Sequence, residues 1–177
     1  MKIIGISGSV RAASNNTGLL RAASAFAPNG IEILGYADIP IYNGDDEAAS
    51  GHPARATEIA EAISQADALL IASPEYNFSI PGGLKNLIDW LSRIRPMPFV
   101  RKPTAILGAA PGPIGTARVQ YELRKVLSAL DADLVNKPEV FVGLSGSKFD
   151  ENGDLTDETS REFVGKLVEA LVKKAGG

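Results

Sequence analysis

The sequence lacks cysteine altogether among its 177 residues and has a single histidine, His52. The absence of cysteine excludes disulfides, thiolate nucleophiles and cysteine-based metal sites. No run of the ~18 apolar residues that a membrane span needs occurs anywhere in the chain. Basic residues do not outnumber acidic ones, since the net charge is −3. This balance argues against nucleic acid or an anionic membrane as a partner attracted by bulk charge.

What is present suits a globular α/β protein. Hydrophobic residues make up 45% of the chain and charged residues 22%, and a chain of this length can bury a core of its own. We therefore expect residues 1–177 to form a single domain. The N-terminus leads straight into an apolar strand-like run with no signal segment, so the simplest expectation is a cytoplasmic protein.

Short apolar runs alternate with longer segments of helical periodicity. The predicted strands are Lys2–Ser7, Ile31–Tyr36, Asp67–Ser73, Thr104–Ala110 and Glu139–Leu144. The predicted helices are Thr17–Phe26, Ala54–Ala66, Gly82–Ile94, Gly115–Leu130 and Asp157–Lys174. The third and fourth strands are apolar throughout, which is typical of parallel strands covered on both faces. The pattern predicts a flavodoxin-like three-layer α/β/α sandwich with a five-stranded parallel sheet in the order 2-1-3-4-5.

The first predicted strand breaks into a short polar loop that leads into a helix. Ser9 and Ser14 can donate hydroxyl groups, and Arg11 can form a bidentate pair with a phosphate. Backbone N–H groups and the positive end of the helix would add to this attraction. The alternative is a polar capping turn with Asn15 or Asn16 as the N-cap, but a cap alone needs neither Arg11 nor two serines. The loop therefore predicts a phosphate site, in which the Asn16 amide can also donate.

Several rival phosphate loops are excluded by their missing residues. The chain has no G-x-x-x-x-G-K-[ST] motif and no G-x-G-x-x-G after the first strand. A phosphatase of this fold needs a cysteine nucleophile in the loop, and none exists. The remaining possibility is a loop that binds a phosphate without cleaving it.

Two further loops follow the third and fourth predicted strands. In the first of them, Tyr76 and Phe78 can flank a flat ring, or they can cover the end of the sheet as satellite core. The other, from Pro111 to Thr116, offers mainly backbone groups. Carboxyl ends of parallel strands lie at one edge of a sheet, so we expect all three loops to meet there.

Three features outside these loops leave alternatives open. The polar segment Asn43–Pro53 is predicted to be a surface loop or a lid. Trp90 belongs either to the core or to a subunit interface. The segment Trp90–Arg101 is apolar and basic, which favours an exposed interface over a plain connection.

Three motifs together resemble a known family. They are G-S-x-R-x-x-S-x-N at Gly8–Asn16, S-P-E-Y-N-x-S-x-P-G-x-L-K-N-x-I-D-W at Ser73–Trp90, and G-x-x-G-x-A-R-x-Q at Gly112–Gln120. In this order they resemble the NAD(P)H-dependent FMN reductases, most closely the quinone/chromate reductase branch. The resemblance extends over nearly the whole chain, and its second motif is long and specific.

The resemblance implies a flavodoxin-like enzyme with non-covalent FMN, which takes hydride from NAD(P)H. Its acceptors would be quinones, free flavins, azo compounds or chromate, and it would form homodimers or homotetramers. By the same resemblance, the FMN phosphate is held by Ser9, Arg11, Ser14, Asn15 and Asn16. The isoalloxazine is bordered by Pro74, Glu75, Tyr76, Asn77 and Phe78, and its far edge is approached by Ala110 and Pro111.

This chain departs from many relatives at a few positions. Phe78 stands where many have tyrosine, which removes a hydroxyl group, and Ala109 and Ala110 replace residues that often carry one. No side chain is an obvious acid or base, because His52 lies in a polar segment typical of the surface. We therefore expect no catalytic side chain and no metal, and a ping-pong cycle that the flavin carries out. A flavodoxin-type electron carrier and a flavin-binding regulatory module remain the alternatives.

Overall fold

The fully apolar runs of the sequence form the middle of a parallel sheet. The computed structural model describes residues 1–176, and every residue of β1 (Ile3–Ser7) and β3 (Ala68–Ala72) is buried there. The other strands are β2 (Ile31–Leu34), β4 (Pro103–Ala109), β5 (Asp133–Leu134) and β6 (Val140–Val142). Their order is β2-β1-β3-β4-β5, with β6 also paired to β4, and the pairs are parallel. The predicted sheet order is confirmed.

The far edge of the sheet differs from the prediction of one fifth strand. β5 pairs with the start of β4, at Pro103 and Thr104, whereas β6 pairs with its end, from Leu107 to Ala109. Two short strands therefore share this edge. The chain between them contains Pro138, which has no N–H group to donate to a ladder, so pairing is interrupted there.

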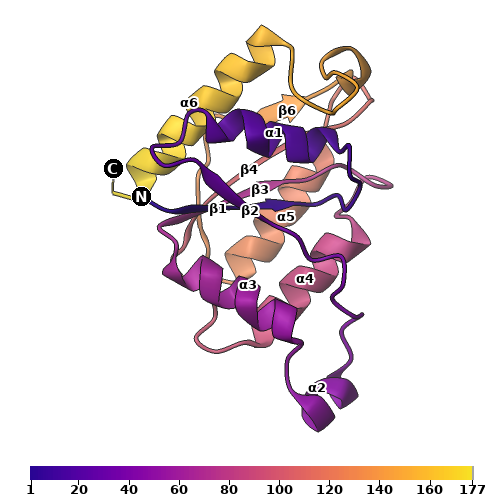
Figure 1. Cartoon of the computed structure of the whole chain (residues 1–177), viewed down its shortest axis with the longest axis vertical. Helices are drawn as coiled ribbons and strands as arrows, with labels where there is room; N and C mark the ends of the chain where they lie inside the picture. The colour runs from indigo at the N-terminus through magenta and orange to yellow at the C-terminus, as the bar shows by residue number, and fades with distance from the viewer. Residues whose placement is uncertain (177) are drawn as a thin grey trace.

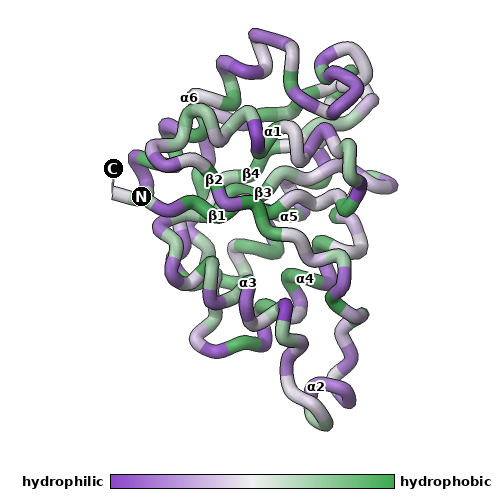
Figure 2. The backbone as a smooth tube through the Cα atoms, viewed as in Figure 1, coloured by the Kyte–Doolittle hydropathy of each residue, from purple (hydrophilic) through white to green (hydrophobic). Residues whose placement is uncertain are grey.

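Helices cover both faces of the sheet (Figure 1). The helices are α1 (Asn15–Ser24), α2 (Gly44–Ser50), α3 (Ala54–Gln65), α4 (Gly82–Arg93), α5 (Ala117–Ala129) and α6 (Glu158–Lys174). One buried cluster joins α3, α4 and α5 to one face of the sheet, and a second joins α1 and α6 to the other. The strands accordingly form the most hydrophobic part of the chain (Figure 2). Among the described residues, no helix is long and apolar enough to cross a membrane.

The segment expected to be a loop or a lid contains the short helix α2. The Asn43 side chain caps this helix by accepting the N–H of Asp45 at 3.0 Å, and its first turn is acidic, which suits a helix N-terminus. No residue of α2 is buried, so the helix has no apolar stripe by which sequence periodicity could reveal it.

A cluster around Trp90 attaches this segment to α4. Trp90 is 1% exposed, and its Nε1 donates to the carbonyl of Pro40 at 2.9 Å, so within the chain it is a core residue. Glu47 of α2 accepts from the Tyr42 hydroxyl at 2.9 Å and pairs with Arg93 Nε at 3.1 Å. These polar contacts hold α2 in the absence of an apolar face.

The apolar part of the segment Trp90–Arg101 is largely internal. Phe99 is 1% exposed and Pro98 is buried, whereas Arg93 and Arg95 are exposed. Phe99 is therefore not part of an exposed apolar surface, because its ring packs into the core beside α4, whereas Val100 is exposed.

Replacement of Gly18 by alanine is expected to destabilise the protein. In an open helix this change gains about 1 kcal/mol of helix propensity. Here, however, a Cβ at Gly18 would overlap the carbonyl oxygen of Gly153. The turn that carries Gly153 is held to α1 by Arg21, whose Nε lies 2.5 Å from Asp154. We expect urea denaturation to show a loss of about 1–3 kcal/mol. Gly82→Ala, at a position with open space, is the control and should not lower stability.

Candidate functional site

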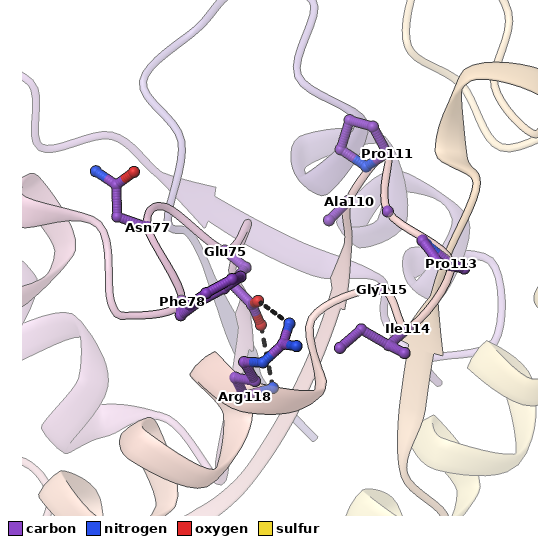
Figure 3. Close-up of a pocket in the computed structure, with 10 residues that line it drawn as sticks. Glu75, Asn77, Phe78, Ala110, Pro111, Pro113, Ile114, Gly115 and Arg118 are labelled. Carbon is purple, nitrogen blue, oxygen red and sulfur yellow. Dashed lines mark hydrogen bonds and ion pairs between the residues drawn. The ribbon is translucent and has the colours of Figure 1, made fainter.

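The loops after β1, β3 and β4 meet at the carboxyl edge of the sheet, as predicted, and enclose two adjoining cavities. One of about 180 Å³ lies at the N-terminus of α1. The other, of about 650 Å³, lies between the loop after β3 and the loop after β4 (Figure 3). Both are lined by Glu75, Ala110 and Pro111. Every cofactor residue proposed from the sequence, from Ser9 to Pro111, lines one cavity or the other.

Hydroxyl groups shape the loop at the smaller cavity from within. Ser7 Oγ accepts the N–H of Ser9 at 3.3 Å and the hydroxyl of Thr17 at 2.9 Å. Ser14 is the N-cap of α1, and its Oγ accepts the N–H of Asn16 at 3.2 Å. The predicted capping role therefore belongs to Ser14, and Asn15 and Asn16 are the first residues of the helix.

Arg11 leaves a positive charge at the mouth of this cavity. Its side chain is exposed, and its guanidinium donates only to the carbonyl of Ala13, at 3.4 Å. Within residues 1–176 no carboxylate lies within 4.0 Å of it, and the first turn of α1 contains no acidic residue. An uncompensated arginine beside a helix N-terminus is suited to a phosphate.

Asn16 connects the first loop to the third. Its side chain is 3% exposed, with Nδ2 donating to the carbonyl of Ala109 at 3.0 Å and Oδ1 accepting the N–H of Ala109 at 2.9 Å. Both polar atoms of the amide are thus bound to the end of β4. The side chain that the sequence offered as a phosphate donor therefore braces α1 against β4.

Glu75 connects the second loop to the start of α5 in a similar way. Its Oε2 accepts the N–H groups of Arg118 at 3.0 Å and Val119 at 3.1 Å, and its Oε1 lies 3.4 Å from Arg118 Nη1 (Figure 3). The N-cap residue of α5, Thr116, makes no capping bond with its own side chain. Glu75 therefore caps α5 from a neighbouring loop.

Loss of this cap is expected to destabilise the protein. Glu75→Ala should lower the free energy of unfolding by about 1–2 kcal/mol, because the N–H groups of Arg118 and Val119 lose their acceptor. Glu75→Gln, which keeps one acceptor oxygen, should lose less. The control is Glu122→Ala on the same helix, where the carboxylate pairs with Lys125 at the surface. Denaturant unfolding measures all three, and equal losses at Glu75 and Glu122 would contradict the capping role.

A tight turn presents the aromatic residues of the second loop to solvent. Tyr76 and Ser79 exchange backbone hydrogen bonds of 3.2 and 3.0 Å, and Asn77 and Phe78 between them have φ angles of 50° and 65°. Two left-handed central residues define a type I′ turn, a strained conformation for phenylalanine. Tyr76 is 48% exposed and Phe78 66% exposed. The interpretation of these rings as satellite core is therefore wrong.

The structure adds residues that the sequence interpretation did not single out. Ser145 is buried against the smaller cavity and donates its N–H to the carbonyl of Ala110 at 3.3 Å. It follows the carboxyl end of β6, and this position was the signal that could have identified it. Ile114 and Arg118 line the larger cavity, and Arg118 lies 4.1 Å from the centroid of the Phe78 ring. The charged residues that line the two cavities are Arg11, Glu75 and Arg118.

Comparison with known proteins agrees with this geometry. Residues 1–146 match the family model described as NADPH-dependent FMN reductase. The chain is 46% identical over 173 residues to the NAD(P)H-dependent FMN reductase PA1204 of Pseudomonas aeruginosa. The aligned region covers 97% of this chain and 93% of that protein. The chain is 42% identical over 172 residues to the quinone reductase of Escherichia coli, covering 94% and 92%.

A solved structure extends the similarity to the whole fold. The flavoenzyme NAD(P)H:(acceptor) oxidoreductase FerB from Paracoccus denitrificans superposes with a TM-score of 0.87 at 30% identity, covering 99% of this chain and 98% of that chain. The chain therefore belongs to the NADPH-dependent FMN reductase family and is a flavodoxin-like oxidoreductase that uses FMN and NAD(P)H.

Proposed function

We propose that this protein reduces quinones with NAD(P)H as the electron donor, and that free flavins, azo compounds and chromate can take the place of the quinone. The observation that carries the proposal is a cavity at the start of α1, lined by Arg11, that adjoins a larger, mainly apolar cavity. This combination fits a ligand with a phosphate at one end and a flat ring at the other. The names of the two curated relatives, an FMN reductase and a quinone reductase, support the same activity.

The residues present fit FMN. Ser9, Arg11, Ser14 and Asn15 would hold its phosphate, because the Arg11 guanidinium and the first turn of α1 provide positive charge and, within residues 1–176, no carboxylate pairs with Arg11. The loop Pro74–Phe78 and the pair Ala110 and Pro111 would border the ring. When bound, FMN supplies the chemistry of accepting hydride from NAD(P)H and passing the electrons on.

The protein's own residues would supply position and charge. Asn16 ties the start of α1 to the end of β4, and Glu75 ties the loop after β3 to the start of α5, so both contacts would preorganise the cavity walls. No histidine or cysteine lines either cavity. The overall reaction converts NAD(P)H, one proton and a quinone into NAD(P)⁺ and a hydroquinone, and we infer that solvent supplies this proton.

We also propose that the protein works as a homodimer or homotetramer in the cytoplasm, where NAD(P)H is available. Large apolar side chains gather around the larger cavity: Phe78 and Ile114 line it, and Tyr121 lies one turn beyond Arg118 on α5. Their exposed fractions are 66%, 45% and 59%. Apolar surface of this kind marks contact sites. Sedimentation velocity of the holoprotein measures the assembly, and a monomer at micromolar concentration would contradict it.

The test of the function is an anaerobic absorbance experiment. Protein reconstituted with FMN is mixed with NADPH, and a quinone is then added. We expect the flavin bands to bleach with NADPH and to return with the quinone. Bound flavin that NADPH cannot reduce would contradict the enzyme and favour a flavodoxin-type carrier or regulatory module. Absence of FMN binding would contradict the site itself.

A further inference from the structure

One charged side chain that lines the larger cavity, that of Arg118, remains half-exposed. Of the residues that line it, only Glu75 and Arg118 are charged. The Glu75 side chain is 7% exposed, whereas that of Arg118 is 48% exposed. A ligand in the cavity therefore faces the guanidinium far more than the carboxylate.

Backbone N–H groups of α5 stabilise the negative charge of Glu75. Its Oε2 accepts two backbone N–H groups at the start of α5, whose N-terminus carries a partial positive charge. The contact from Arg118 Nη1 to Oε1 is longer, at 3.4 Å. The shorter hydrogen bonds of the carboxylate therefore come from the helix, and the half-exposed Arg118 guanidinium still has donors that face the cavity.

The Arg118 guanidinium is held in place by an aromatic ring. It lies 4.1 Å from the centroid of Phe78, a distance at which a cation and a ring attract each other. The backbone of Phe78 is held in turn by the hydrogen bonds between Tyr76 and Ser79. Apart from Nη1, no guanidinium nitrogen of Arg118 donates to a described residue, so a planar fork of donors remains for a ligand.

Apart from Asn77, the other side chains that line the cavity are apolar. Ile114 lies on the wall opposite Arg118 and Phe78 (Figure 3). Pro113 continues that wall and carries no side-chain donor or acceptor, whereas Ala110 and Pro111 would border the FMN ring. A ligand that uses both features is flat and apolar over most of its area and has one anionic oxygen at its edge.

We propose that Arg118 makes the enzyme selective for flat acceptors with an ionised edge oxygen, that is, hydroxyquinones in their anionic form. This rests on the proposed quinone reductase function and specifies its substrate class. The anionic acceptor gains two electrons and one proton from NAD(P)H and one proton from solvent, and it leaves as the monoanion of the hydroxylated hydroquinone. Arg118 forms charge-assisted hydrogen bonds to the anionic oxygen and takes no part in the electron transfer.

The test compares two acceptors of similar shape. 2-Hydroxy-1,4-naphthoquinone is ionised at neutral pH, and 2-methyl-1,4-naphthoquinone is neutral. Holoprotein is first reduced anaerobically, and the second-order rate constant of reoxidation by each quinone is measured by stopped flow. In Arg118→Gln we expect the ratio of the anionic to the neutral rate constant to fall about tenfold. Arg118→Lys, which keeps the charge, should lose at most about threefold. Both variants keep the backbone N–H at position 118, which donates to Glu75 Oε2.

A binding measurement separates selectivity from reactivity. Calorimetric titration of oxidised holoprotein with 2-hydroxy-1,4-naphthoquinone should give about tenfold weaker binding in Arg118→Gln at low salt, and the difference should shrink as salt is added. Equal changes for both quinones would overturn the proposal, as would no change in either. A change confined to reduction by NADPH would overturn it too, because Arg118 would then hold the donor. If the parent protein reduces neither quinone, the proposed function itself fails.

Discussion

We expect the replacement of Arg11 by alanine to weaken FMN binding about 100-fold, which is the largest effect we expect on the cofactor. Among residues 1–176, Arg11 is the only cationic side chain that lines the smaller cavity, and no carboxylate lies within 4.0 Å of it. Its loss removes a charge-assisted pair with the phosphate, and the helix N-terminus remains as the other source of positive potential. Quenching of FMN fluorescence by apoprotein measures the dissociation constant.

Two controls make this result specific to the phosphate. Riboflavin has the same ring without the phosphate, so its affinity should not change in Arg11→Ala. Arg21 lies on α1, the helix that follows the Arg11 loop, but it pairs with Asp154 outside the cavity, so Arg21→Ala should leave FMN affinity within about twofold. Equal weakening of FMN and riboflavin, or equal weakening in both variants, would contradict a phosphate contact at Arg11.

The second large effect concerns stability. Asn16→Ala should lower the free energy of unfolding by about 3 kcal/mol, because two hydrogen bonds are lost and the N–H and C=O of Ala109 remain buried without partners. The damage lies where the first and third loops meet, so FMN affinity should fall as well. Guanidinium denaturation of apoprotein isolates the stability effect from the cofactor.

The neighbouring asparagine provides the matched control. Asn15 lines the same cavity, is half-buried and makes no side-chain hydrogen bond within the described residues. Asn15→Ala should change the free energy of unfolding by less than about 0.5 kcal/mol while weakening FMN binding. If instead Asn15→Ala destabilised the protein and Asn16→Ala did not, the division of roles between brace and ligand would be reversed.

The sequence predicted the positions of the site residues better than their roles. The motif residues were identified because parallel strands all end at one edge of the sheet, and that geometry follows from the strand order. Asn16 and Glu75 lie at this edge as expected. Their polar atoms bind backbone groups of Ala109, Arg118 and Val119, however, and the direction of a side chain depends on neighbours that are distant in sequence.

The features that the sequence missed share a physical cause. Helix α2 buries no residue, so no periodic pattern marks it. Arg118 lies inside one of the family motifs, but only folding brings it beside Phe78 and Glu75. Conversely, Phe99 looked exposed because it is flanked by basic and proline residues, although its ring is buried. Local composition indicates the average environment of a segment, whereas burial is decided residue by residue.

Because β5 and β6 divide the edge of the sheet between them, the walls of the cavities differ in how readily they open. β1 and β3 are joined by five paired residues in the centre of the molecule, whereas β6 joins β4 through three at the edge. Segments at such an edge open in local fluctuations that leave the centre intact. The wall that carries Ser145 can therefore open while the loops after β1 and β3 stay in place. Backbone amides of Val140–Val142 should accordingly exchange with solvent deuterium earlier than those of Ile4 and Leu70.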